Sequence, residues 1–136
     1  MPKRIDHVAI IVRDIEQALV FYRDTLGIPP GEITDVPTEE VRIAFLPMGG
    51  PGGSEIELVQ PTSPTSSLAR YLEKRGEGLH HICLEVDDID AALSDMQMKG
   101  APALDSVPRV AAEGRAIFSH PKAANGVLVE LLEREK

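Results

Sequence analysis

The chain has 136 residues, of which 43% are hydrophobic and 26% charged, a composition typical of one globular domain with its own core. Its 14 Lys and Arg residues against 22 Asp and Glu residues give a formal net charge of −8, which argues against a broad nucleic-acid-binding face. No apolar run is long enough to span a membrane and no apolar leader precedes residue 5, so we expect neither a membrane span nor a secretion signal. The single cysteine, Cys83, cannot form an internal disulfide, which favours a reducing, cytoplasmic setting.

The first half of the chain is predicted to form a strand, a helix and three further strands. Residues 5–12 alternate in polarity and are rich in β-branched side chains, which is typical of a strand. Asp14 is a suitable N-cap for a helix whose apolar positions recur at helical spacing, and Gly27 is a suitable end for that helix. The three strands that follow are expected at 32–36, 41–46 and 54–60.

The second half repeats this order after a linker helix at about residues 65–76. It begins with a strand over residues 79–86 and a helix capped by Asp87 or Asp88, and three strands follow near 103–107, 115–119 and 127–132. The fold class is therefore predicted to be α+β. Two βαβββ modules, at about 4–61 and about 78–133, are expected to form a single domain over 1–136, with curled sheets around a metal-containing cleft.

A pattern of histidine and glutamate recurs in both halves. His7 lies in the first expected strand and His81 in the corresponding strand of the second half, at positions that differ by 74. Glu57 and Glu130 lie in later strands, each between two aliphatic neighbours, at positions that differ by 73. These near-equal offsets indicate two modules that each bring one imidazole and one carboxylate to the same relative place.

All four polar side chains are expected on the face of their strand that points away from the helices. Successive side chains of a strand point to opposite faces, and the aliphatic neighbours suit the helix-packed face. A lone strand histidine or glutamate is more often structural, but a carboxylate among apolar neighbours is costly to bury unless it is paired or bound to a metal. The duplicated pair therefore favours one divalent ion such as Co²⁺, Mn²⁺, Ni²⁺, Fe²⁺ or Zn²⁺. Four ligands around an octahedral ion leave two positions for a bidentate substrate, whose carbonyl the ion would polarise.

Along nearly its whole length the chain resembles the vicinal oxygen chelate superfamily, which includes glyoxalase I, extradiol dioxygenases and bleomycin-resistance proteins. The fuller resemblance is to the methylmalonyl-CoA epimerase family. It is carried by an opening strand, a double-histidine stretch, a His-Pro-Lys element and a C-terminal strand, at residues 5–10, 78–89, 118–122 and 125–131. The double histidine and the His-Pro-Lys element are the most specific parts.

The resemblance implies a metal-dependent isomerase acting on an acyl-CoA. Its metal ligands fall on His7, Glu57, His81 and Glu130, the four residues that the repeat selects. The implied ion is Co²⁺, with Mn²⁺, Ni²⁺, Zn²⁺ or Mg²⁺ as alternatives. The implied reaction interconverts the two C2 epimers of methylmalonyl-CoA through a metal-stabilised enediolate, as part of propionate metabolism. The implied assembly is a homodimer.

Inversion at C2 needs an acid/base group on each face of the substrate. Glu130, or Glu57 detaching from the metal, could serve as one base. Part of the family has a glutamate where this chain has Ile43, so the second group has no candidate there. Lys122 and His120 are expected to contact the CoA or the substrate carboxylate, or simply to cap the turn before Pro121.

Three alternatives use the same residues differently. A lactoylglutathione lyase of the glyoxalase I type would share the metal and the enediolate chemistry. An extradiol dioxygenase would use two histidines and one carboxylate on Fe²⁺, so Glu57 as a fourth ligand argues against it. A non-catalytic binding protein of the bleomycin-resistance type would hold a small molecule without bound metal.

Overall fold

The computed structural model describes residues 2–135, which fall into two compact units. Residues 8–80 form one of them, called here the continuous unit. Residues 2–7 and 81–135 form the other, called here the split unit. The boundary falls inside strands β1 (Pro2–Ile11) and β5 (Gly78–Val86), so each of these strands contributes to both units.

The continuous unit contains strands β2 (Ile33–Val36), β3 (Val41–Pro47) and β4 (Glu55–Pro61), joined as antiparallel neighbours. Residues 8–11 of β1 lie next to β4, and Val12 N donates to Val59 O at 2.9 Å. The predicted strands of this half are therefore confirmed, within three residues at the start of β1 and within one residue at every other end.

Side chains of the continuous unit alternate between two apolar clusters, as the strand periodicity predicts. One cluster packs against helix α1 (Ile15–Leu19) and includes Val12, Ala44 and Leu58. The other lies on the opposite face and includes Ala9, Val41, Ile43 and Val59, with Phe45 packed against it. In β1, Ile10 thus packs with the helix-facing cluster and its neighbour Ala9 with the second cluster.

Helix α1 is shorter than the sequence predicts, because its second half is a π-helix over Val20–Thr25. Asp14 caps α1 by accepting a hydrogen bond from Glu16 N, as predicted. The π-helix has a wider turn than an α-helix, so the residues after it leave the face that α-helical spacing assigns to them. Leu26, which α-helical spacing from Leu19 and Tyr22 would place on the core face, is 53% exposed, and Ile28 packs against the core instead.

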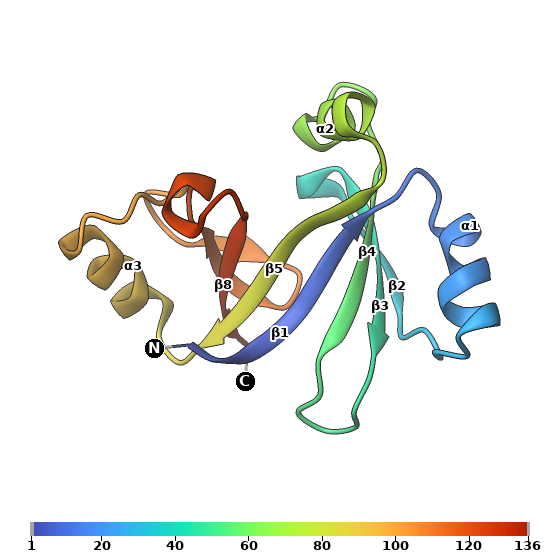
Figure 1. Cartoon of the computed structure of the whole chain (residues 1–136), viewed down its shortest axis with the longest axis horizontal. Coiled ribbons are helices and arrows are strands. Elements are labelled where there is room, and N and C mark those ends of the chain that lie inside the picture. The colour runs from blue at the N-terminus through green and yellow to red at the C-terminus, as the bar shows by residue number, and fades with distance from the viewer. Residues whose placement is uncertain (1, 136) are drawn as a thin grey trace. The chain divides into compact units, whose positions relative to one another are not determined.

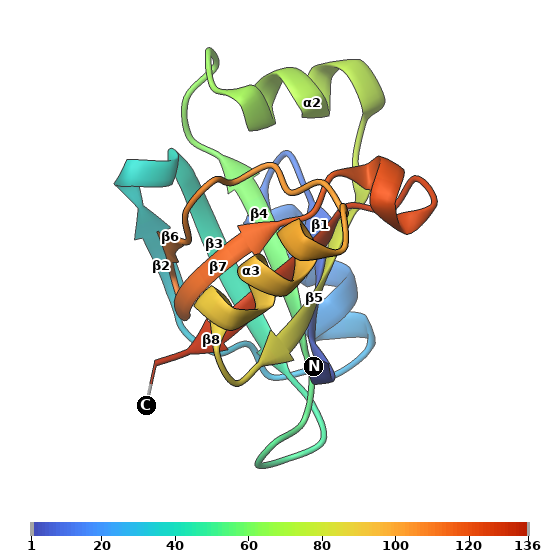
Figure 2. The same cartoon turned by 90° about the vertical axis from the view of Figure 1, so that its left-hand side faces the viewer.

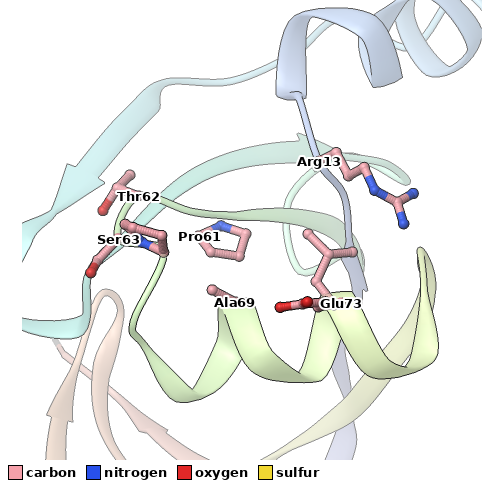
Figure 3. A pocket seen from close by; sticks show the side chains of 8 residues that line it. Arg13, Pro61, Thr62, Ser63, Ala69 and Glu73 are labelled. Carbon is pink, nitrogen blue, oxygen red and sulfur yellow. The ribbon is translucent and has the colours of Figure 1, made fainter.

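Between β4 and β5 the chain forms α2 (Ser67–Arg75), which confirms the predicted linker helix. Ser66 caps it by accepting from Ala69 N at 3.1 Å, and it ends at Gly76, whose φ of 79° favours glycine. A pocket of about 490 Å³ opens between this helix and the end of β4 (Figure 3). The described residues that line it are Arg13, Pro61, Thr62, Ser63, Pro64, Ala69, Leu72 and Glu73, and they include none of the predicted site residues.

The split unit has the strand order β1-β5-β8-β7-β6, using residues 2–7 of β1. Its later strands are β6 (Arg109–Ala111), β7 (Gly114–Phe118) and β8 (Val129–Arg134). Helix α3 (Ile89–Met98), which Asp88 caps, lies against β7 and β8 (Figures 1 and 2). The repeated strand and helix order confirms the predicted α+β class.

Within residues 2–135, no helix combines the length and apolar character needed to span a membrane.

The strand predicted near 103–107 is wrong, because the strand lies later in the chain, at Arg109–Ala111. Residue Ala103 forms only an isolated bridge with Ser119. The Asp105 carboxylate accepts a hydrogen bond from Phe118 N at 2.6 Å. Because the backbone N of Phe118 donates to this side chain, it is not available to a backbone carbonyl of a continuing β-ladder. Regular strand pairing therefore resumes only further along the chain.

A polar side chain from a strand holds the start of the helix in each module. Gln60 in β4 accepts a hydrogen bond from Ile15 N at 2.9 Å, and Glu133 in β8 accepts one from Ile89 N at 2.9 Å. Position 60 differs from position 133 by 73, the same offset that relates Glu57 to Glu130. The repeat in the sequence therefore includes these structural contacts as well as the candidate ligands.

Candidate metal centre

Three of the four predicted ligands belong to the split unit. His7 lies in β1, His81 in β5 and Glu130 in β8. Strands β5 and β8 pair in parallel, with Glu130 opposite Cys83, which places Glu130 close to His81 in the neighbouring strand. All three side chains are buried, with His7 only 3% exposed. Three adjacent strands of the sheet therefore each contribute one of these buried polar side chains.

The three side chains converge on one point. Glu130 Oε1 lies 3.3 Å from His7 Nε2 and 3.2 Å from His81 Nε2, and the three atoms lie within 4.8 Å of one another. The imidazole rings are 5.5 Å apart between centroids and inclined by 73°. Two ring nitrogens and a carboxylate oxygen so arranged are donors that Co²⁺, Mn²⁺, Ni²⁺ and Zn²⁺ accept. Their type, spacing and burial fit the predicted ion.

The surroundings hold Glu130 as an anion. Burial by itself acts to raise the pKa of this carboxyl, but hydrogen bonds and charge from His7 and His81 outweigh burial and lower its pKa well below the usual value. The second oxygen, Oε2, accepts a hydrogen bond from Arg109 Nη2 at 2.8 Å. A carboxylate stabilised in this way is a strong metal ligand and a weak proton acceptor.

Arg109 is a site residue that the sequence analysis missed. It lies in β6 and reaches Glu130 across 21 positions of the chain. Its guanidinium also lies 4.3 Å from the ring centroid of Phe118, and that ring makes an edge contact with His81 at 5.1 Å. No local pattern marks Arg109, because its role depends on strand pairing between β6, β7 and β8.

Asp6 is a second missed residue, although it precedes His7 directly. Its Oδ1 lies 2.8 Å from His7 Nδ1, and its side chain is fully buried. Burial acts to raise its pKa, but hydrogen bonds from His7 and Arg134 outweigh this and lower it below the usual value. Asp6 is therefore ionised and can only accept, so Nδ1 of His7 carries the proton. The available signal was an acidic residue directly before the candidate ligand His7, inside a predicted strand.

Glu57, the fourth predicted ligand, belongs to the continuous unit and is 7% exposed. It pairs across β3 and β4 with Phe45, and Val59, two residues further along β4, pairs with Ile43. Glu57 therefore shares a strand face with apolar side chains of the second cluster. Ile43 is buried there, and its aliphatic side chain can carry no proton.

His120 and Lys122 lie at a short 3₁₀ turn, Pro121–Ala124, in the split unit. His120 Nδ1 accepts a hydrogen bond from the backbone N of Lys122 at 3.0 Å. The ring thus caps the turn, which is one of the two roles expected from the sequence. The side chain of Lys122 is exposed.

Cys83 lies close to this centre, packed with Ala116 and Leu132 in a small core cluster. Burial raises the pKa of the Cys83 thiol to about 12. Because the thiolate is the reactive form, a rise in the pKa from 9.0 to about 12 lowers the thiolate population by about 1000-fold near neutral pH.

The Cys83 thiol is therefore expected to be unreactive in the folded protein. We expect a disulfide reagent to leave the folded protein unlabelled over a time in which the urea-unfolded protein reacts with one thiol per chain. Prompt labelling of the folded protein would contradict the core assignment.

Comparison with known proteins places this arrangement in a family. The chain matches the family model of the Glyoxalase/Bleomycin resistance protein/Dioxygenase superfamily over residues 6–118. It is 40% identical over 130 residues to the mitochondrial methylmalonyl-CoA epimerase of Homo sapiens, covering 94% of this chain and 72% of that protein. It is 43% identical over 131 residues to the ethylmalonyl-CoA/methylmalonyl-CoA epimerase of Cereibacter sphaeroides, covering 94% and 96%.

A solved structure agrees with these relatives. A variant of Streptomyces coelicolor methylmalonyl-CoA epimerase, in complex with 2-nitronate-propionyl-CoA, is similar with a TM-score of 0.92 and 36% identity, covering 100% of both chains. The family model covers most of the chain, and both curated relatives exceed 30% identity over nearly all of it. The chain therefore belongs to the glyoxalase/bleomycin resistance protein/dioxygenase superfamily and, within it, to the methylmalonyl-CoA epimerase family.

Proposed function

We propose that this chain interconverts the two C2 epimers of methylmalonyl-CoA with the help of one divalent metal ion. The observation that carries the proposal is the convergence of His7, His81 and Glu130 on one point, in a chain similar to named epimerases. The related Streptomyces structure holds an acyl-CoA analogue, which supports an acyl-CoA as the ligand class.

His7, His81 and Glu130 would hold the ion through Nε2, Nε2 and Oε1, and we propose Glu57 as the fourth ligand. When bound, the ion supplies positive charge that stabilises the negative charge developing on the carbonyl oxygens of the substrate. The metal-binding atoms are buried, which limits screening by water and strengthens their electrostatic effect. We propose Co²⁺ as the ion, as the family resemblance implies; the donor set suits it as it suits Mn²⁺, Ni²⁺ and Zn²⁺.

Of the two predicted bases, we propose that Glu57, once detached from the metal, removes the C2 proton. The C–H bond breaks, its electron pair moves toward the thioester carbonyl, and the Glu57 carboxylate becomes a carboxylic acid. A proton from solvent water then adds to the opposite face of C2 and completes the inversion, and Glu57 returns its proton to solvent. Glu57 suits this role better than Glu130, whose lowered pKa and hydrogen bond from Arg109 make it a poor proton acceptor.

We also propose that Lys122 contacts the anionic CoA portion of the substrate. Its side chain is exposed on a turn that His120 stabilises by accepting a backbone hydrogen bond. An ammonium group at this place can contact a phosphate without a burial cost.

A homodimer, which the family resemblance implies, and a cytoplasmic setting, which cysteine usage favours, stay predictions. Light scattering of the purified protein tests the first of them.

The deciding experiment is hydrogen exchange at C2 of methylmalonyl-CoA in deuterated buffer. Protein loaded with Co²⁺ is expected to incorporate deuterium at C2 and to convert either epimer into a mixture of both. The hemithioacetal substrate of a lactoylglutathione lyase, incubated in parallel, is expected to remain unchanged. Failure to exchange the C2 proton, with bound metal verified by elemental analysis, would overturn the proposal.

A further inference from the structure

The carboxylate of Asp6 lies at the centre of a buried charged network in the split unit. A fully buried carboxylate is costly unless other groups satisfy it, and here three side chains do so. Oδ1 lies 2.8 Å from His7 Nδ1 and accepts from Arg134 Nη2 at 3.1 Å. Oδ2 accepts from Arg134 Nε and from Arg4 Nη2, the latter at 3.2 Å.

Both arginines are themselves held in place by further carboxylates. Arg4 Nε donates to Glu85 Oε1 at 2.8 Å, and Arg134 Nη2 lies 2.7 Å from Glu113 Oε2. Asp6 is therefore fixed from β1 by Arg4 and from β8 by Arg134, and Glu85 in β5 completes the support. Because two anchored arginines hold the Asp6 carboxylate, the carboxylate fixes the orientation of the neighbouring His7 ring.

The contact with His7 has a direct consequence for its other ring nitrogen. Because the Asp6 carboxylate only accepts hydrogen bonds, Nδ1 of His7 carries a proton, which leaves Nε2 as the ring nitrogen that can bind an ion. Nε2 lies 3.3 Å from Glu130 Oε1. A carboxylate behind a histidine ligand also makes the ligating nitrogen more basic and fixes the ring orientation.

We propose that Asp6 is the positioning residue of the centre, which holds the His7 ring in the orientation that turns Nδ1 toward Asp6 and Nε2 toward the metal. The inference rests on the proposed function, since it assigns Asp6 a part in holding the same metal. It goes beyond the four predicted ligands, because Asp6 itself acts only through His7 and binds no ion.

The test compares Asp6→Asn with a matched control, Asp90→Asn. Asp90 makes an exposed ion pair with Arg115 at 2.7 Å in the same unit, so the control removes the same charge without touching a candidate ligand. Co²⁺ affinity is measured by competition with a chelator of known affinity. We expect Asp6→Asn to bind Co²⁺ about 10- to 100-fold more weakly than the unaltered protein, and Asp90→Asn to match it.

A second measurement keeps the inference testable if Asp6→Asn does not fold. Ring nitrogen shifts of His7, measured by NMR in the unaltered protein loaded with diamagnetic Zn²⁺, report which ring nitrogen binds the ion. Binding through Nε2 with a proton on Nδ1 is expected, and binding through Nδ1 would overturn the inference. Equal Co²⁺ affinity in Asp6→Asn and the unaltered protein would also overturn it. Failure of the unaltered protein to bind any divalent ion would overturn the proposed function and this inference with it, whereas binding through Nδ1 would overturn this inference alone.

Discussion

The His81→Ala variant is expected to lose both divalent metal binding and epimerisation. His81 Nε2 is one of three buried donors that converge on one point, 3.2 Å from Glu130 Oε1. Loss of a group that only supports a ligand weakens metal binding by about 10- to 100-fold, so loss of the ligand itself should cost at least about 100-fold. Elemental analysis and deuterium exchange at C2 measure the two effects on the same sample.

The neighbouring histidine provides a matched control for this change. His80 packs edge-on against the Tyr71 ring at 4.8 Å in the continuous unit. The His80→Ala variant removes the same side chain one residue earlier in β5 and is expected to keep its metal. Full metal occupancy in His81→Ala would show that the ligand set is wrong, whatever the activity of that variant.

The second large effect is expected from Glu57→Gln. Glutamine has the shape of glutamate and keeps an oxygen that can bind a metal, but it cannot take up a proton at neutral pH. If Glu57 is the base, C2 exchange should fall by about 10²- to 10⁴-fold, the usual contribution of a positioned base. Co²⁺ affinity should change by much less, because the remaining donors and the amide oxygen stay in place.

Two further variants separate this loss from a general effect. Glu16→Gln makes the same chemical change at an exposed position of α1 and should exchange C2 at the unaltered rate. Glu130→Gln should lose metal together with exchange, because its carboxylate contacts both histidines and Arg109. A Glu57→Gln protein that exchanges C2 at full rate would assign the proton transfer to another group.

Sequence periodicity predicted those parts of the fold that depend on local patterns. The phase of β1 around His7, the Asp14 and Asp88 caps and the end of α2 at Gly76 all follow from neighbouring residues. The local features need only a few adjacent positions to specify them. The convergence of His7, His81 and Glu130 was predicted differently, from the offsets of 74 and 73 that relate the two halves of the chain.

The features that were missed depend on contacts between distant segments. The π-helix over Val20–Thr25 changes the period of a helix whose sequence still looks α-helical. The strand β6 is displaced because Asp105 uses the donor of Phe118. Arg109 reaches Glu130 only after strand pairing is complete, so no short pattern could reveal it.

The division of β1 between two units has a consequence for how the protein is made. The continuous unit, residues 8–80, can complete its own contacts while the ribosome is still synthesising the second half of the chain. The split unit cannot, because Asp6 must meet Arg134, 128 residues later, before His7 is held in place. Closing so long a loop is slow and costs chain entropy. A nascent chain therefore offers His7 without its partner ligands, and assembly of the metal centre waits until translation of β8 is complete.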